Sequence, residues 1–359
     1  MTSSTRPLPV PAGRVLGALG GRWTGVATTV MVGACVALVA VVPSAAGSSW
    51  HGVLHQVRGM DVGWLVVLTA VWWAGLWAHS FVLTASLPGL TSRRAIGLNL
   101  AGSAVANSVP LGGGLSVAVT SAMISSWGFN PAALGAFLTV STVANLVVRL
   151  AAGAAALVWL TGSVPGSIGP GRVATLAVLV TLCLVAVATC LSTDRAAATT
   201  VAWCGRALRR LRRTGDPARC RTDGLAGVRL RHHVVRLVRR SWLRLGGGMV
   251  AYILLLSVLL DLALHALGTP IAWPLVLATV ALERLVTAVP VTPGGVGIAE
   301  LTVTGCLAVA GAPAVDAAAG ALVYRLFTYF IEIPVGLLVA GAWGWAQSRA
   351  PARPAWRAA

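Results

Sequence analysis

The stretch "ERLVTAVPVTPGGVGIAE", residues 283–300, places charged residues and helix breakers inside a long apolar region. A glutamate and an arginine precede the prolines and glycines, and a second glutamate follows them. In lipid, backbone released from a helix survives only where it is buried in protein or lines a water-filled cavity. The meaning of the stretch therefore depends on the solvent that surrounds the chain.

Composition identifies that solvent as a lipid bilayer. The chain has 359 residues, of which 57% are hydrophobic and 10% are charged, whereas a soluble domain carries about 25% charge. Apolar segments of roughly 20 residues recur along it, which is the length of a transmembrane helix. We therefore expect an all-α polytopic membrane protein.

The basic residues indicate topology and not nucleic-acid binding. All 27 are arginine, and the formal net charge is +18. No nucleic-acid recognition motif accompanies the charge, and arginine gathers between predicted spans, as the positive-inside rule requires of cytoplasmic loops. The exclusive use of arginine suggests a GC-rich bacterial genome.

Five regions are predicted along the chain. They are a basic cytoplasmic N-terminus (1–23), a first membrane half (24–192), an Arg-rich cytoplasmic segment (193–245) with an amphipathic helix at 229–245, a second membrane half (246–347) and a cytoplasmic tail (348–359). Apolar spans are predicted at 24–42, 62–84, 95–110, 112–127, 131–161, 172–192, 246–267, 272–290, 295–311 and 315–346. The amphipathic helix is expected to lie on the anionic inner leaflet. The alternative is that its arginines only determine topology.

Counting crossings predicts two re-entrant hairpins. If the arginines at 93–94 are cytoplasmic and one crossing from residue 131 reaches an outer loop at 162–171, the segment 95–127 must enter and leave on the inner side. Each of its arms has about 16 residues, which is short for a full span. The segment 272–311 must likewise enter and leave on the outer side. Each hairpin precedes a long helix with one internal arginine, Arg149 or Arg325. This arrangement is typical of an inverted-topology repeat with a central site.

The tips of the predicted hairpins contain the helix breakers. They are Pro110, Gly112, Gly113 and Gly114 in the first hairpin, and Pro293, Gly294, Gly295 and Gly297 in the second. A half-helix that restarts there directs its N-terminal amides and its positive dipole end inward, which is a suitable seat for an anion. The alternative is that both motifs are simple kinks eased by neighbouring helices.

Ionisable residues inside the spans are the candidate substrate-binding residues: Arg149, Glu283, Arg284, Glu300 and Arg325. Each costs about 2.5–3.5 kcal/mol in lipid, so each should face the interior, form a pair or mark a pathway. Because Glu283 and Arg284 are adjacent, we expect them on different helix faces with partners elsewhere. We expect Glu300 to pair with Arg325 or Arg149. The alternative role for all five is a structural ion pair.

These residues resemble a known family. The segments "RLVTAVPVTPGGVGIAE" (284–300), "ALVYRLFTYFIEIPVG" (321–336) and "ANSVPLGGGLSVAV" (106–119), with the helix that carries Arg149, resemble the flippase-like transmembrane domain of lysylphosphatidylglycerol synthases over about residues 25–346. The resemblance implies a helical bundle with re-entrant helices that moves a lipid headgroup between leaflets. The family's pattern then falls on Pro293, Gly294, Gly295, Gly297, Glu300 and Arg325.

The chain departs from that family in two ways. Many relatives carry a glutamate and an arginine after the first glycine-rich turn, where this chain reads "GGGLSVAV" (112–119) without charge. The first half is therefore expected to bind its ligand differently, or the site rests on the second half. No non-membrane segment is long enough for the aminoacyl-transferring domain of a synthase, so no lysyl transfer is expected.

The leading hypothesis is a bacterial inner-membrane protein that translocates an anionic phospholipid or a polyprenyl-phosphate headgroup. No cofactor or metal is expected, because the cysteine and histidine spacings do not match a metal site and no phosphate-binding loop is present. We do not expect an enzyme. The alternatives are a transporter of small anionic solutes, an enzyme or accessory subunit acting on lipid-linked sugars, and a scaffold without transport.

Overall fold

The computed structural model describes residues 49–108, 112–163, 219–288 and 292–349, with scattered helical positions between 171 and 185. The span predicted at 24–42, the turn residue Pro110 and most of the span predicted at 172–192 lie outside these residues. All regular structure in the described part of the chain is helical, so the all-α prediction is confirmed.

Four helical segments of the described chain are long and apolar enough to cross a membrane. They are Val62–Ser86, Pro131–Gly162, Leu230–Ala266 and Ala314–Arg349, and they belong to α4 (Val62–Ser86), α7 (Pro131–Ser163), α10 (Arg219–Ala266) and the α13–α14 segment. Helices suit a bilayer because every backbone group is satisfied within the segment. The protein is a multi-pass membrane protein.

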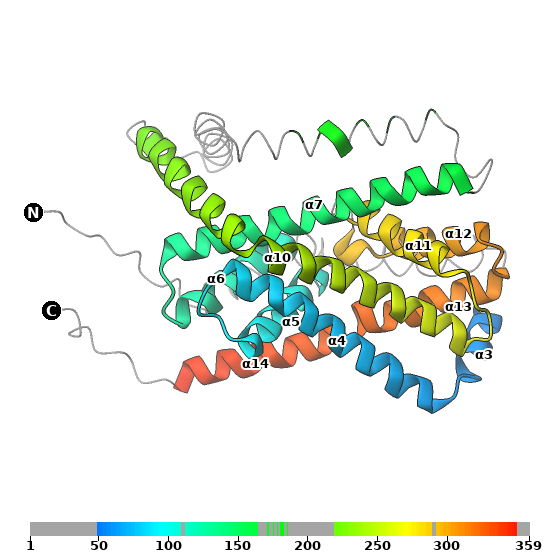
Figure 1. The fold of residues 1–359 in the computed structure, drawn as a ribbon. Helices are drawn as coiled ribbons and strands as arrows, with labels where there is room; N and C mark the ends of the chain where they lie inside the picture. Colours follow the sequence, from blue (N-terminus) through cyan, green and yellow to red (C-terminus); the bar gives the residue numbers. More distant parts are fainter. Residues whose placement is uncertain are drawn as a thin grey trace, which may run out of the picture.

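Two pairs of shorter helices complete the bundle, each divided by a break. The first pair is α5 (Ser92–Ser108) and α6 (Gly112–Ser126). The second is α11 (Trp273–Val286) and α12 (Ile298–Val309), with a 3₁₀ turn η1 (Pro293–Gly295) between them. In Figure 1, α5 and α6 lie toward the end of the molecule where α14 (Glu332–Arg349) ends, whereas α11 and α12 lie toward the opposite end. The helix breaks predicted from the two glycine clusters are therefore present.

The core forms where α10 runs along α4 and α13 packs against α10 (Figure 1). Leu260 and Leu264 of α10 are fully buried, as are Leu68 of α4 and Tyr324 of α13. Around this core, α14 packs on α5 and α11 packs on α7. The broken pairs are thus held against the long helices, which fixes the position of each break.

The helix α10 differs from the prediction. The amphipathic helix expected at 229–245 and the span expected at 246–267 form one continuous helix, Arg219–Ala266. The glycines at 246–248 lie between the two predicted segments, and the helix continues through them. Gly248 faces α4, where a Cβ would lie 2.9 Å from a methyl group of Val82, so glycine allows the two helices to pack closely. The apolar side of 230–245 packs on α4 and α7 through residues such as Val234 and Leu245, so protein covers that side of the helix.

The helix predicted at 315–346 is present as one helical segment, Ala314–Arg349, but its winding changes along its length. It consists of α13 (Ala314–Arg325), a π-helical segment η2 (Leu326–Phe330) and α14 (Glu332–Arg349). π-Helical turns are rare and occur frequently at functional sites. Here the widened turn directly follows Arg325.

A short helix at the start of the described chain was not predicted. It is α3, Trp50–Arg58, and the side chain of Ser49 caps it by accepting a hydrogen bond from the Gly52 amide at 3.2 Å. Val53 of α3 is buried in a small cluster with Ala318 and Ala319 of α13, which anchors this helix to the bundle.

Candidate functional site

A polar cavity of about 480 Å³ lies where the two helix breaks meet. Four predicted binding residues line it: Arg149, Glu283, Arg284 and Arg325. Five predicted turn residues also line it, namely Gly112, Gly113, Gly114, Gly294 and Gly295. Helices from both halves of the sequence therefore contribute to one site.

Two predicted residues, Glu300 and Gly297, lie beside the cavity instead of lining it. Glu300 is buried behind it, with 4% of its surface exposed. Gly297 is the residue that precedes α12, and Pro293 begins η1. These residues shape the break, whereas the lining residues face the cavity.

The two breaks touch through Tyr329 of η2. The Tyr329 hydroxyl donates a hydrogen bond to the carbonyl of Asn107, near the end of α5, at 3.0 Å. A Cβ built on Gly294 would collide with the Tyr329 ring and would lie 2.8 Å from the Asn107 side-chain oxygen. Gly294 also has φ 59°, a conformation that residues with a side chain rarely adopt. Only glycine fits here.

Glu300 and Arg325 form a buried ion pair that closes the second break. The Arg325 Nε lies 2.7 Å from Glu300 Oε1, and the other guanidinium arm donates to the Gly294 carbonyl at 3.0 Å. The second oxygen of Glu300 accepts from the Gly297 amide at 2.6 Å. The predicted pairing of Glu300 with Arg325 is confirmed. The Glu300 carboxylate also takes the position at the start of α12 where a bound anion was expected.

The prediction for Glu283 and Arg284 was wrong. The two side chains pair with each other: Arg284 Nε contacts one Glu283 oxygen, and Nη2 donates to the other at 2.9 Å. Adjacent residues point to different helix faces at Cα, but the long arginine side chain curls back to its neighbour near the end of α11. Arg284 also donates to the Tyr324 hydroxyl at 3.4 Å, so its charge is compensated.

Arg149 differs from the other two cavity arginines. Within the described part of the chain it makes no hydrogen bond and no ion pair. Two further residues that line the cavity have a buried polar atom without a hydrogen-bond partner in the described part of the chain. These atoms are His79 Nδ1 and Asn145 Oδ1. Asn145 precedes Arg149 by one helical turn on α7. This side of the cavity therefore has a cation without a direct hydrogen-bond or ion-pair partner among the described residues, and unused polar groups.

The first break is more open than the second. A Cβ on Gly112 would lie 2.5–2.6 Å from the carbonyl oxygens of Val105 and Ala106, so α6 begins in close backbone contact with α5. Gly113 and Gly114 are exposed, and nothing lies within 4 Å of a Cβ at either position. The first amides of a helix have no partner within that helix. The start of α6 thus faces the cavity without the carboxylate that covers the start of α12.

Sequence reasoning missed a polar stripe on α5. Asn99, Ser103 and Asn107 all line the cavity, and their spacing of four residues places them on one helix face. That spacing inside an otherwise small and apolar span was the signal that could have identified them.

Glu332, which lines the cavity and is 7% exposed, shares a helix surface with Arg325 but was not included among the binding residues.

Comparison with known proteins agrees with the resemblance noted from the sequence. The family model described as lysylphosphatidylglycerol synthase TM region matches residues 26–336. Every residue that lines the cavity falls inside this range. No match was found among curated proteins or among solved structures.

Proposed function

The chain belongs to the family of the lysylphosphatidylglycerol synthase TM region, and from this premise we propose that it translocates an anionic lipid headgroup between leaflets. The observation that carries the proposal is Arg149, a cation without a partner among the described residues, in a cavity that both helix breaks line. A charged residue is costly in a membrane interior and marks a site or a pathway by default. The ligand is an anionic phospholipid or a polyprenyl phosphate.

We infer that both broken pairs are re-entrant and enter from opposite sides of the membrane. α6 has 15 residues and α12 has 12, so each is at most about 23 Å long and falls short of the roughly 30 Å hydrocarbon core. The α5–α6 pair followed by α7, and the α11–α12 pair followed by α13, then form an inverted repeat. The cavity lies near the bilayer centre in this arrangement.

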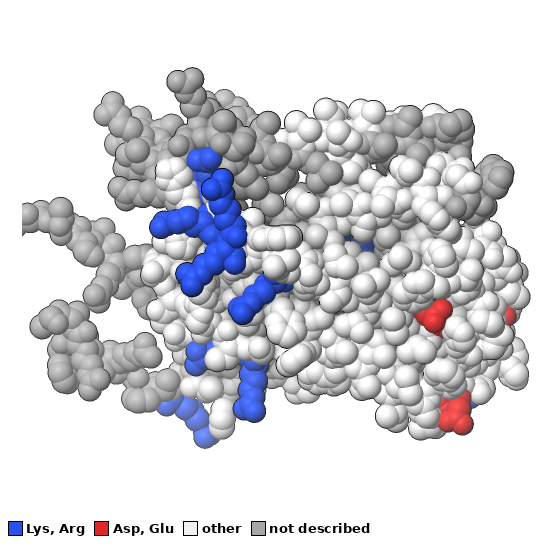
Figure 2. Space-filling model, viewed as in Figure 1, with Lys and Arg blue, Asp and Glu red and all other residues white. Residues whose placement is uncertain are grey.

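The proposed orientation places both termini in the cytoplasm of a bacterium, across its inner membrane. On the face shown in Figure 2, most exposed arginines gather toward one end of the molecule, and acidic side chains lie toward the opposite end. Arg93 and Arg94 are exposed residues in the first turn of α5, and Arg349 is the exposed last residue of α14. The positive-inside rule assigns such an end to the cytoplasm.

In the proposed mechanism the phosphate contacts Arg149 while the acyl chains remain in lipid. Asn145, His79 and the open start of α6 offer further polar groups around the headgroup. The Glu300–Arg325 and Glu283–Arg284 pairs keep the second break in shape without adding net charge. The proposal includes no covalent step and no nucleotide, so the headgroup moves down a gradient of lipid or of a coupled ion.

The test is lipid translocation by the full chain in proteoliposomes. Fluorescent phosphatidylglycerol is placed in both leaflets, and a membrane-impermeant quencher reports how fast inner-leaflet lipid becomes accessible. Loss of a hydrogen bond to a charged group costs about 1.5–3 kcal/mol, so Arg149→Gln should slow the rate roughly 10- to 100-fold. Arg93→Gln, on an exposed arginine outside the cavity, is the matched control and should keep the rate.

Three outcomes would count against the proposal. Equal rates in Arg149→Gln and unsubstituted protein remove the cavity cation from the pathway. No lipid movement in the unsubstituted protein, together with uptake of labelled glycerol phosphate, favours the transporter of small anionic solutes. Turnover of a lipid-linked sugar by the purified protein favours the enzyme.

A further inference from the structure

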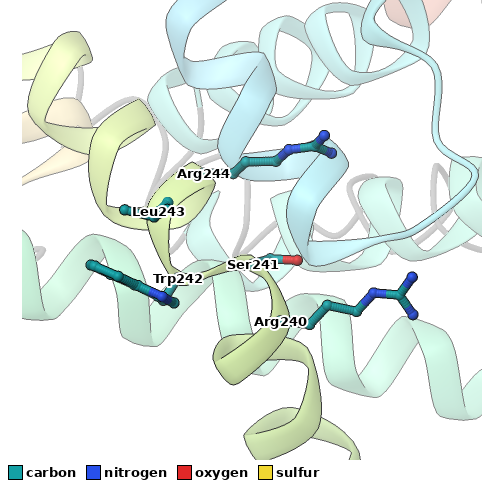
Figure 3. Close-up of a pocket in the computed structure, with 5 residues that line it drawn as sticks. All are labelled: Arg240, Ser241, Trp242, Leu243 and Arg244. Atoms are coloured by element: carbon teal, nitrogen blue, oxygen red, sulfur yellow. The ribbon is translucent and has the colours of Figure 1, made fainter.

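The hollows of the described chain differ in what lines them. One, of about 390 Å³, is lined by residues 240–244 of α10 alone. Figure 3 shows Arg240 and Arg244 projecting on the opposite side of that helix from Leu243. One stretch of one helix provides no facing wall for a ligand. The central cavity, in contrast, is lined by several helices and contains a carboxylate that the proposed path of the headgroup does not use, Glu332.

Glu332 lies at the start of α14, two positions after the π-helical segment η2. It lines the central cavity and, together with Tyr252 of α10, also lines a hollow of about 10 Å³ beside α4. That is roughly the smallest space that holds one water molecule. Trp72 of α4 lines the same small hollow, and its Nε1 is buried without a hydrogen-bond partner in the described chain. Glu332 therefore borders both a polar cavity and a nearly closed hollow.

Glu332 has no arginine in ion-pair contact among the described residues. The other two carboxylates of the site are engaged, because Glu283 pairs with Arg284 and Glu300 pairs with Arg325. An ionised carboxylate inside a membrane is costly, and in transporters such carboxylates serve as proton relays. Of the carboxylates that the structure describes at this site, Glu332 is thus the one whose charge can change without breaking an ion pair.

The charges around Glu332 balance. The charged groups of the site are three cations and three carboxylates, namely Arg149 of α7, Arg284 of α11, Arg325 of α13, Glu283 of α11, Glu300 of α12 and Glu332 itself. The lining residues of α5, α6 and η1 are uncharged, and Ser103 of α5 is close to the Glu332 carboxylate. With all six groups ionised the net charge of the site is zero, so an anion gains no net attraction there.

The site also contains groups that titrate but are uncharged in their ordinary state near neutral pH. They are His79 of α4 and the phenols of Tyr252, Tyr324 and Tyr329. A tyrosine ordinarily loses its proton near pH 10, whereas a histidine gains one near pH 6.5. The effect of Glu332 must therefore be separated from that of His79.

We propose that Glu332 binds a proton that crosses the membrane together with the anionic headgroup. The proton converts the carboxylate to a neutral carboxylic acid and leaves the site with one net positive charge. This charge compensates a phosphodiester monoanion such as the headgroup of phosphatidylglycerol. When the headgroup leaves on the other side, the proton leaves with it and the carboxylate is restored. The inference rests on the proposed translocation and names the ion to which it is coupled.

The experiment imposes a pH difference of one unit across the proteoliposomes of the translocation assay. Potassium buffers without sodium are used, with valinomycin to hold the membrane potential at zero, and protein-free vesicles give the background. If one proton accompanies each lipid, fluorescent phosphatidylglycerol should accumulate up to about 10-fold in the leaflet on the alkaline side. Glu332→Gln is uncharged at every pH, so it should equalise the lipid between leaflets without accumulation.

Two further variants control for the loss of a carboxylate. Glu332→Asp keeps a titratable group at the same place and should keep the accumulation. Asp61→Asn removes an exposed carboxylate outside the cavity, and asparagine can still cap the start of α4. This matched control should accumulate the lipid as the unsubstituted protein does. Thermal unfolding verifies that each variant is folded.

A second measurement detects the proton without transport. The full chain in detergent is mixed with short-chain phosphatidylglycerol in weakly buffered solution, and an indicator dye reports proton uptake over a range of pH around neutrality. Uptake should approach about one proton per bound lipid in the unsubstituted protein and should vanish in Glu332→Gln. His79→Gln should keep both the proton uptake and the accumulation, whatever its rate.

Several results would overturn the assignment. Accumulation that persists in Glu332→Gln removes this carboxylate from the coupling, and loss of coupling in His79→Gln alone moves the proton to the histidine. Accumulation driven by a sodium gradient at equal pH assigns the carboxylate to a metal cation. Lipid movement by the unsubstituted protein without accumulation or proton uptake overturns the coupling but leaves translocation intact. Absence of any lipid movement contradicts the translocation itself, and proton uptake on lipid binding then decides the role of Glu332.

Discussion

The Arg325 guanidinium joins Glu300 of α12 and the Gly294 carbonyl of η1 in one buried cluster, with Arg325 Nε 2.7 Å from Glu300 Oε1. The two side chains are 3% and 6% exposed. Glu300 also accepts from the Gly297 amide. One ion pair therefore satisfies a carbonyl and an amide that the break in the helix releases, at a depth where each unsatisfied group costs several kcal/mol.

Removing one partner of this pair should destabilise the protein strongly. Arg325→Met leaves Glu300 buried and charged without a cation, and we expect a loss of about 3–5 kcal/mol. Thermal unfolding in detergent measures the change. The double variant Arg325→Met with Glu300→Gln removes both charges, so it should be more stable than Arg325→Met alone. A double variant that is the less stable of the two would contradict a dominant ion pair.

The second prediction concerns Gly294. Gly294→Ala places a methyl group against the Tyr329 ring on a backbone with φ 59°, and strain of this kind costs about 1–3 kcal/mol before any packing change. We expect a lower thermal midpoint and slower lipid translocation. Gly305→Ala is the control, because Gly305 is an exposed position of α12 with nothing within 4 Å of a Cβ. That control should be neutral or slightly stabilising.

The sequence was sufficient to predict features that follow from local chemistry. Glycine and proline clusters predicted the breaks that separate α5 from α6 and α11 from α12. Buried charge predicted that Glu300 would find an arginine. Each of these features depends on short-range backbone preferences or on the high cost of an unpaired charge in lipid, and both operate whatever the tertiary contacts are.

Features that depend on contacts between distant segments were not predicted. The pairing of Arg284 with Glu283 depends on the path of a flexible side chain, and sequence spacing gives only the direction of Cβ. The continuity of α10 through Gly248 depends on close packing with α4. The polar stripe of α5 becomes recognisable as cavity lining only when α7 and η1 are placed opposite it. Side-chain conformation decides the first, and tertiary packing decides the other two.

The third prediction separates the two contacts of Tyr329. Its ring lies under the Arg325 guanidinium at 4.7 Å, and its hydroxyl bonds to the Asn107 carbonyl. Tyr329→Phe keeps the ring and loses only the hydrogen bond, so we expect a loss of about 1 kcal/mol. Tyr329→Ala loses both contacts and should cost about 3–5 kcal/mol. Phe330→Leu, at the neighbouring exposed position, should change little. Equal losses for Phe and Ala at position 329 would contradict a contribution from the ring.

The last prediction requires stability and transport to change in opposite directions. The side-chain oxygen of Asn145 is buried in the cavity wall and has no hydrogen-bond partner among the described residues. A group of this kind costs about 1–3 kcal/mol, so Asn145→Leu should raise the thermal midpoint. Transport should fall in the same variant, because the substitution removes a polar group one turn from Arg149.

Thr304 of α12 provides the matched control for Asn145. Its hydroxyl is also buried and without a partner in the described chain, but it lies outside the cavity. Thr304→Val should therefore raise the thermal midpoint and leave the translocation rate unchanged. The two variants are compared by thermal unfolding and by lipid translocation in the same proteoliposome preparation. If Asn145→Leu stabilises the protein and transports at the full rate, the unpartnered polar groups around Arg149 do not contact the moving headgroup, and the proposed path through the cavity is wrong.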